Sequence, residues 1–587
     1  MAWGSMHLWP CCFGGPATHP LPVLRRRAQR CLRGIFGAAA LAAVCLTSAP
    51  AAFPVTAVGM PPKRPPTDAA VVWFRKCLRL HDNAALVEAV EVAPQHVCPV
   101  FVIDPHFGPG SVGVNRFAFL LESLRDLDCQ LRKRYGSRLL VLRGKPETVF
   151  GSLLQTGEPV LKGKPRLLMW ERDTEPYARK RDAAVEKLAE ENGVEVRTFA
   201  GHTLYDPEEA IKANKGKVPN AMPAMVALAK LLGDPPMPLK TPAKLPSLPV
   251  GVPARVDKAF SVPSLEEMGY DPPPEKSSFP GGESAGLLRL SEKLKDSAYI
   301  CGFQKPKTRS TAFNPPSTTG LSPYLKFGCV SARHFFYGLK NVYARKKHSQ
   351  PPESLLGQLY FREIAYLQGF SVPNFERQAG NPACKPIPWG KNPKLLAAWE
   401  QGRTGFPFID AAMRQLTRVG WLHHLARHAV ACFLCRGDLW LSWEQGRDVF
   451  DKYLLDADWS INTMNWLALS GAAPWSPPFF RVYNPAPKMD SALNVQDPEG
   501  NYIREFVPEL SKMPKEYIYT PWTAPLEVQK AAKCIIGKDY PRPVVDHAKV
   551  SAENIARFKR ALSETKATGA KGSSGASSRS AKRPRKA

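Results

Sequence analysis

Short apolar runs alternate with longer amphipathic stretches between residues 69 and 201. The runs AAVVWF, VCPVFVID, RLLVLRG, PRLLMWER and VEVRTFAG have the length and composition of buried strands. The stretches between them, such as NRFAFLLESLRDLDCQLRKRYG, repeat apolar residues at helical spacing. Strands that alternate with helices indicate βαβ units, so the pattern predicts an α/β domain over residues 68–201 with a doubly wound parallel sheet. No G-x-G-x-x-G opens its first helix, so a dinucleotide-binding fingerprint is missing.

Two further segments follow the α/β domain. Residues 202–285 contain a proline-rich passage and are predicted to form an interdomain connector. From Gly286 to about Leu469 the pattern is mostly helical, with aromatic residues throughout, and it predicts an all-α domain over residues 286–562. The sequence shows no internal repeat.

The two ends of the chain predict different cellular compartments. Residues 1–59 have an arginine-rich start, an apolar run from Ile35 to Leu46 and then small residues, which is the plan of a signal peptide. The run is too short to span a bilayer, and we expect no membrane segment in the mature protein. SAPAAF also resembles the presequences of plastid proteins; the alternative is an upstream extension before a start at Met60. Residues 563–587 are predicted to be a disordered basic tail whose KRPRK fits a nuclear address.

The net charge indicates which kind of partner to expect. The formal charge is +28, and the chain stays basic when its two ends are set aside. Such a surplus favours a polyanionic partner such as nucleic acid, with a merely soluble basic surface as the alternative. The 13 cysteines show no paired spacing, so we expect reduced thiols rather than a disulfide framework.

The stretch GWLHHLARHAVACFLC, residues 420–435, places polar side chains on a helix that otherwise looks buried. His424, His428, Cys432 and Cys435 fall on one helical face. The outer two would lie about 16 Å apart, which excludes a single zinc ion on one helix. Histidines satisfied in the core are the alternative, but two of them one turn apart beside Arg427 favour a polar site.

A second polar group falls in the motif DADWSIN. Asp456, Asp458 and Asn462 lie within two helical turns, and Asn462 and Trp466 share a face. Two acids in so apolar a context need partners, and Arg427 is the expected one. Three more tryptophans, Trp389, Trp440 and Trp443, stand nearby in the sequence; taken singly, each is more simply explained as core packing.

Several long motifs resemble the photolyase/cryptochrome family. They are TTGLSPYLKFGCVS, GQLYFREIAY, CKPIPWGKNPKLLAAWEQGRTGFPFIDAAMRQL, GWLHHLARHAVACFLCRGDLWLSWEQGRDVF, DADWSIN and PKEYIYTPWTAP. The resemblance covers residues 69–562 and is strongest to the branch of (6-4) photolyases and animal-type cryptochromes, especially plant and algal (6-4) enzymes. His424 distinguishes this branch, because cyclobutane-dimer photolyases typically have asparagine there.

The resemblance implies a folded-over FAD in the helical domain and an antenna chromophore of deazaflavin or folate type, of unknown identity. The phosphates would rest on the TTGLS loop, formed by Thr318, Thr319, Gly320, Leu321 and Ser322. The residues expected around the rest of the cofactor are Gln358, Arg362, His424, Arg427, Asp456, Ala457, Asp458 and Asn462, with Asn462 facing flavin N5. The electron chain to the flavin would be Trp466, Trp443 and Trp389, with Trp440 as a fourth member.

The resemblance also implies a function: light-driven repair of (6-4) photoproducts in UV-damaged DNA by a monomeric lyase. His424 would donate a proton to the lesion, and His428 would be its partner. Three expected lesion-pocket positions depart from the family pattern, namely Phe361, Ala365 and Ala468. Because stacked aromatic rings hold flipped bases, these departures favour the alternative function, a blue-light receptor or clock-type regulator that acts through protein partners.

Overall fold

The computed structural model describes residues 69–573, apart from 94, 158, 162–163, 249–258, 274 and 276. The presequence predicted over residues 1–59 and the KRPRK motif lie outside the described residues. Within the described part of the chain, no helix is both long and apolar enough to cross a bilayer.

A five-stranded parallel sheet forms the core of the N-terminal part, as the alternating pattern predicts. The strands follow the order β3-β2-β1-β4-β5, which confirms the doubly wound topology. Each predicted apolar run contains one strand, and their bounds are β1 Ala70–Phe74, β2 Val97–Ile103, β3 Leu140–Arg143, β4 Leu167–Glu171 and β5 Glu195–Phe199.

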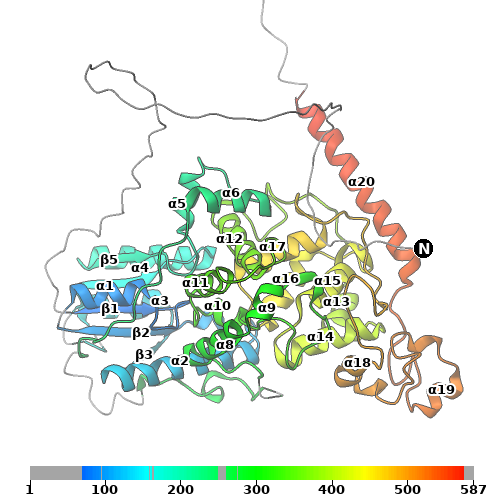
Figure 1. The fold of residues 1–587 in the computed structure, drawn as a ribbon, viewed down its shortest axis with the longest axis horizontal. Helices are drawn as coiled ribbons and strands as arrows, with labels where there is room; N and C mark the ends of the chain where they lie inside the picture. The colour runs from blue at the N-terminus through cyan, green and yellow to red at the C-terminus, as the bar shows by residue number, and fades with distance from the viewer. Residues whose placement is uncertain are drawn as a thin grey trace, which may run out of the picture. The chain divides into compact units, whose positions relative to one another are not determined.

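Helices cover both faces of the sheet (Figure 1), so every residue of the central strands β1 and β2 is buried. Alternate residues of β1 pack into two cores: Val72 lies with helices α1 and α2, whereas Trp73 lies with α3 and α4. These helices are α1 Ala84–Val92, α2 Val114–Tyr135, α3 Pro146–Thr156 and α4 Pro176–Glu191.

The predicted connector is not a plain linker. It contains two helices, α5 Pro207–Ala213 and α6 Met222–Leu232, and α6 packs on a helix of the C-terminal half. The reason lies in MPAMVALAKLL, whose Met222, Met225 and Leu228 are buried on one face. The high proline content therefore predicts a linker correctly for only part of the segment, because the part that contains α5 and α6 is helical.

The C-terminal half is helical, as predicted. Helices α12, α16 and α17 pack together at its centre, beside the sheet domain (Figure 1). The helix bounds are α8 Glu283–Lys295, α9 Ser297–Gly302, α10 Ser322–Lys326, α11 Ala332–Tyr343, α12 Leu355–Ser371, α13 Pro393–Glu400, α14 Pro407–Val419, α15 His424–Cys432, α16 Trp443–Tyr453, α17 Trp459–Ser470, α18 Asn501–Phe506, α19 Leu526–Ala531 and α20 His547–Ser573.

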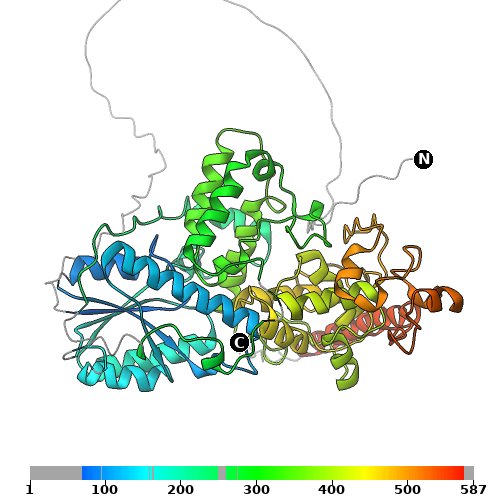
Figure 2. The ribbon, with the colours of Figure 1, turned by 90° about the horizontal axis from the view of Figure 1, so that it is seen from below.

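Helix α20 extends further than the sequence predicts. It continues to Ser573, so residues 563–573 are helical where a disordered tail is expected. Alanine, glutamate and lysine in ALSETKATGAK favour this extension. The helix lies along the side of the helical half away from the sheet (Figure 2), and the Asn554 amide ties it to the Gly437 and Asp438 carbonyls at 3.1 and 3.2 Å.

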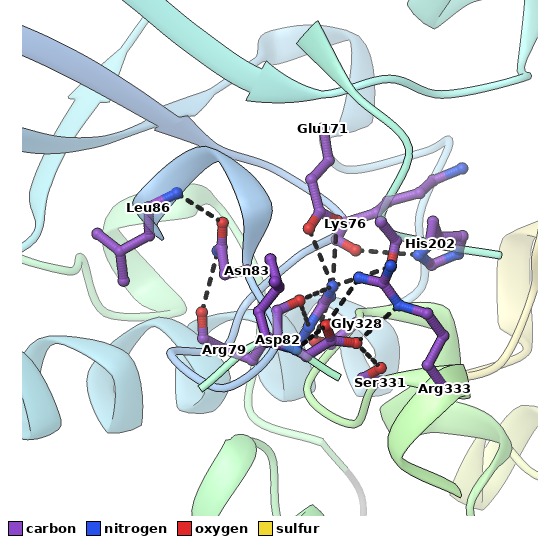
Figure 3. A network of polar contacts seen from close by, with 12 residues as sticks. Lys76, Arg79, Asp82, Asn83, Leu86, Glu171, His202, Gly328, Ser331 and Arg333 are labelled. Carbon is purple, nitrogen blue, oxygen red and sulfur yellow. Dashed lines mark hydrogen bonds and ion pairs between the residues drawn. The ribbon is translucent and has the colours of Figure 1, made fainter. Parts of the chain in front are cut away.

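A buried ion network joins the sheet domain to the helical half (Figure 3). Asp82, which follows β1, receives two hydrogen bonds from the Arg333 guanidinium of α11 at 2.7 and 3.0 Å. Arg79 donates to Glu171 at the end of β4 and to the Gly328 carbonyl, at 2.9 and 3.1 Å. The Asp82–Arg333 ion pair and the bond from Arg79 to the Gly328 carbonyl thus cross the boundary and hold the two halves together.

Candidate functional site

The histidine segment folds as a short helix with an unusual start. Gly420 ends α14 in the left-handed region, at φ 71°. His423 then caps α15, and its Nδ1 accepts a hydrogen bond from the Leu425 amide at 3.1 Å. Helix α15 passes into a π-helical turn, η4, over Phe433–Gly437. The single helix expected to extend to Cys435 therefore ends at Cys432.

The two histidines of the pair contact one another. The Nε2 atoms of His424 and His428 lie 2.9 Å apart, and His428 Nδ1 lies 3.3 Å from the Tyr483 hydroxyl. The i, i+4 spacing brings the rings to one side of the helix, as predicted. Tyr483, which the sequence analysis missed, comes from the unusual segment after α17.

Burial and neighbouring cations keep this pair uncharged. Burial lowers the pKa of His428 to about 3, and the Lys305 ammonium adds to the effect. Burial and Lys305 also lower the pKa of His424 well below its usual value. Burial, followed by the Arg427 charge, lowers the pKa of Lys305 itself to about 8. The imidazolium expected for a proton donor therefore requires a negatively charged ligand nearby.

Arg427 connects the histidine helix to the acids of the DADWSIN motif. Its Nη2 donates to both carboxylate oxygens of Asp456 at 2.9 and 3.0 Å, and its Nε donates to the Leu422 carbonyl at 2.8 Å. The ion pair is therefore held in a fixed orientation at the wall of a pocket. The partnership is the one predicted for Arg427, but with only one of the two acids.

This pocket gathers six of the predicted site residues. The lining includes His424, Arg427, Asp456, Ala457, Asn462 and Trp466, together with apolar side chains such as Phe450 and Leu454.

Asp458 and Arg362 lie outside this lining. Asp458 caps α17 through the Ile461 amide and accepts a hydrogen bond from the Tyr366 hydroxyl at 2.5 Å. Burial opposes its ionisation, but the Lys76 charge, together with the Tyr366 hydrogen bond and the Arg362 charge, holds the pKa of Asp458 below its usual value. Arg362 lies over the Tyr366 ring and pairs with Glu363. Asp458 therefore lies at the boundary between the two domains, where Lys76 of the sheet domain and Tyr366 of α12 interact with its carboxylate.

The TTGLS loop forms an open turn beside a cation. Gly320 has φ 64°, and a Cβ there would lie 2.7 Å from the guanidinium of Arg289. Arg289 in turn donates to the Thr319 carbonyl at 3.0 Å. Leu321 is buried and Ser322 begins α10. A glycine that keeps the backbone open next to an arginine suits a phosphate group. The sequence analysis missed Arg289.

Gln358 and the loop residue Thr318 are less informative. The Gln358 amide donates to the Pro352 carbonyl at 3.0 Å, which holds it within its own turn. Thr318 is half-buried. The pocket and the loop nevertheless fit a flavin nucleotide: the pocket provides an Arg–Asp pair and a carboxamide, and the loop provides a glycine turn with a cation.

The predicted electron-chain tryptophans occupy two regions. Trp466 and Trp443 are fully buried, and Gly446 of the Trp443 helix lies against the Trp466 ring, where a Cβ would be only 2.2 Å from it. Trp389 and Trp440 form a pair with ring centroids 5.0 Å apart, covered by Phe558 of α20. The ring centroid of a fifth tryptophan, Trp399, lies 6.1 Å from that of Trp466, and the predicted electron chain does not include Trp399.

The three expected lesion-pocket residues do not line the pocket. Ala365 is 1% exposed and Ala468 is 8% exposed, so both are core positions. Phe361 is half-buried and packs against the same core. The small side chains of Ala365 and Ala468 allow the neighbouring helices to pack closely, whereas a large ring there would need more space.

Comparison with known proteins identifies both halves. Residues 70–240 match the family model described as DNA photolyase, and residues 355–560 match the FAD binding domain of DNA photolyase. The chain is 47% identical over 531 residues to the (6-4)DNA photolyase of Oryza sativa subsp. japonica, covering 88% of this chain and 94% of the relative. It is also 47% identical over 496 residues to cryptochrome-1 of Sylvia borin, covering 84% of this chain and 78% of the relative.

A solved structure agrees with this assignment. The class III photolyase of Agrobacterium tumefaciens superposes with a TM-score of 0.70 at 28% identity, over 86% of this chain and all of that chain. The fold and the two matched domains define a flavoprotein built from an α/β domain and a helical FAD-binding domain. The chain belongs to the DNA photolyase/cryptochrome family.

Proposed function

We propose that this protein is a light-dependent DNA lyase that repairs (6-4) pyrimidine–pyrimidone photoproducts. The observation that carries the proposal is the contact between His424 and His428, whose Nε2 atoms lie 2.9 Å apart beside the pocket lined by Arg427, Asp456 and Asn462. The 47% identity to plant (6-4)DNA photolyases agrees with it.

The residues of the chain have distinct parts in this reaction. Arg427, Asp456 and Asn462 would hold FAD in the pocket, and Gly320 with Arg289 would hold its phosphates. When bound and reduced, FAD supplies on illumination the electron that the lesion receives. His424 then donates a proton to the lesion so that a hydroxyl group returns to its original base.

The electrostatics of the site make this proton transfer conditional. Burial and Lys305 keep the histidine pair neutral in the protein alone. Negative charge from the phosphates, and then from the electron on the lesion, raises the pKa of His424 because opposite charge favours the imidazolium. The histidine pair is therefore charged only when substrate is in place, and Lys305 offers a cation to the same substrate.

A repair assay with matched lesions tests the proposal. Under near-ultraviolet or blue light, the reduced holoprotein is expected to restore (6-4) photoproducts and to leave cyclobutane dimers unchanged. Binding to damaged DNA should weaken steeply with salt, because basic groups supply much of the affinity. A flavin-loaded, photoreducible protein that repairs neither lesion would overturn the enzyme function.

The alternative function is a blue-light receptor that acts through protein partners. It is favoured by Ala365 and Ala468, because the resemblance leads us to expect aromatic rings that stack on a flipped base at these positions. The equal identity to cryptochrome-1 agrees with it. Light-dependent binding of a protein partner, without repair, would establish this function.

Two further features of the protein remain proposals. An antenna chromophore of deazaflavin or folate type would suit the α/β domain, because ligands of doubly wound sheets bind at the carboxyl ends of the strands. A pocket there is lined by Arg172 and His202, and the spectrum of any extracted second chromophore tests the idea. The compartment, nucleus or plastid, follows from N-terminal sequencing of the native protein together with its location in cells.

A further inference from the structure

One pocket residue is held in a single orientation by a neighbour outside the pocket. Asn462 of α17 lines the pocket beside the histidine pair and is 6% exposed. Its Nδ2 donates to Oδ1 of Asp451, on α16, at 2.8 Å, and to the backbone carbonyl of Arg447 at 3.2 Å. Asp451 itself is not part of the pocket lining, and the hydrogen bond to Asn462 connects it to the pocket.

The chemistry of these partners fixes which end of the carboxamide faces the pocket. A carboxylate and a backbone carbonyl are both acceptors, so they bind the NH₂ end of Asn462 and exclude its oxygen. Both N–H groups are then used. Asn462 Oδ1 accepts no hydrogen bond from the described residues, and it is not among their fully enclosed unpaired atoms. An acceptor therefore faces the pocket.

The charges around Asp451 keep its carboxylate in place. Arg447 Nε lies 3.9 Å from Asp451 Oδ2, and the Arg116 guanidinium donates to the Asp451 backbone carbonyl at 2.5 Å. Burial raises the pKa of Asp451 to about 6, with Arg116 and the Asn462 hydrogen bond opposing that rise. At neutral pH the group is ionised and acts as an acceptor.

We propose that Asp451 is a positioning residue that turns the Asn462 carbonyl oxygen toward the flavin, so that the site favours a flavin carrying hydrogen on N5. This inference rests on the proposed flavin function and on Asn462 facing N5. A hydrogen-bearing N5 is a donor that Oδ1 satisfies, whereas a bare N5 is an acceptor that would face another acceptor. The electrons come through the tryptophans from an added thiol and the proton comes from solvent. Asp451 takes part in neither transfer.

The test is the two-electron reduction potential of the bound FAD in the holoprotein. In Asp451→Asn, the new amide can donate to Asn462 Oδ1, so the carboxamide loses its single orientation. We expect the ratio of reduced to oxidised flavin at a fixed potential to fall about tenfold, which is about 30 mV for a two-electron couple. Asp451→Glu retains the acceptor and should restore most of the wild-type potential.

Matched variants separate positioning from a general disturbance of the helix. Asp448 is an exposed carboxylate on the same helix that pairs with Arg447, so Asp448→Asn should leave the potential unchanged. In an Asn462→Ala background, Asp451→Asn should have no further effect, because the intermediary is gone. If Asp451→Asn does not fold, the smaller Asp451→Ser, which lacks the carboxylate, should show a shift in the same direction.

The outcomes distinguish this inference from the proposed function. A variant that is fully loaded with FAD but has the wild-type potential overturns the positioning role of Asp451 and leaves the repair function standing. A shift that persists without Asn462 also overturns it. Wild-type protein that binds no FAD at all would overturn both.

Discussion

His424 and His428 share a single proton position, because their Nε2 atoms face one another at 2.9 Å. One ring must donate and the other must accept, so the two rings cannot both carry a proton on the facing nitrogen. The pair consequently titrates as a unit rather than as two independent groups. A charge near one histidine therefore changes the protonation of the other as well.

Removing either ring should abolish repair while leaving the flavin in place. We expect His424→Ala to lower turnover of (6-4) photoproducts by at least about 100-fold, the size of a lost general acid. Lesion binding should change much less, because the phosphate contacts remain. Repair kinetics and DNA binding, measured on the same flavin-loaded preparation, check this. His348→Ala, at a histidine stacked on Tyr343 away from the pocket, is the control.

The acid stability of the protein should depend on His428. Its pKa is lowered to about 3 in the folded protein and lies near 6.5 in an unfolded chain. Between these values the unfolded chain binds more protons, so stability rises with pH across the window and is lost on acidification from about pH 6.5. The loss from this group is at most about 1.4 kcal/mol per pH unit. Chemical unfolding at pH 7 and pH 4.5 should show a smaller loss for His428→Gln; an equal loss would contradict the assignment.

Lys305 should affect both DNA binding and the pH profile of repair. Because its charge lowers the pKa of His424, Lys305→Met should shift the pH optimum of repair upward. If Lys305 also contacts a phosphate, binding weakens and the slope of log affinity against log salt falls by about one. Titrations at several salt concentrations measure this. Lys307→Met is the control, because Lys307 is exposed on the same short turn.

The electron chain can be tested with two tryptophans that contact one another. Trp466→Phe should slow photoreduction of the bound flavin by at least about tenfold, the effect of about 1.4 kcal/mol on a barrier. Trp399 lies 6.1 Å from Trp466 but is not in the predicted chain, so Trp399→Phe should slow it much less. Absorbance changes under blue light with an external reductant provide the measurement. Equal rates for wild type and Trp466→Phe would exclude this chain.

Local sequence patterns predicted the parts of the site that depend on local spacing. The period of apolar residues gave the strands, and the i, i+4 spacing gave the contact between His424 and His428. Lys305 and Asp451 could not be found in this way, because each reaches the site from a different element across the tertiary fold. Asp458 lies outside the lining of this pocket for a related reason: its spacing suits the pocket, but Tyr366 and the Lys76 charge interact with its carboxylate.

The Asp82–Arg333 contact has a consequence for attempts to divide the protein. A fragment that ends in the connector would contain Asp82 without Arg333, and a buried charge that loses its partner costs about 3–5 kcal/mol. The helical half expressed alone would have the complementary defect. The two halves should therefore fail to fold as separate fragments yet reassociate when produced together, as expected of one cooperative unit.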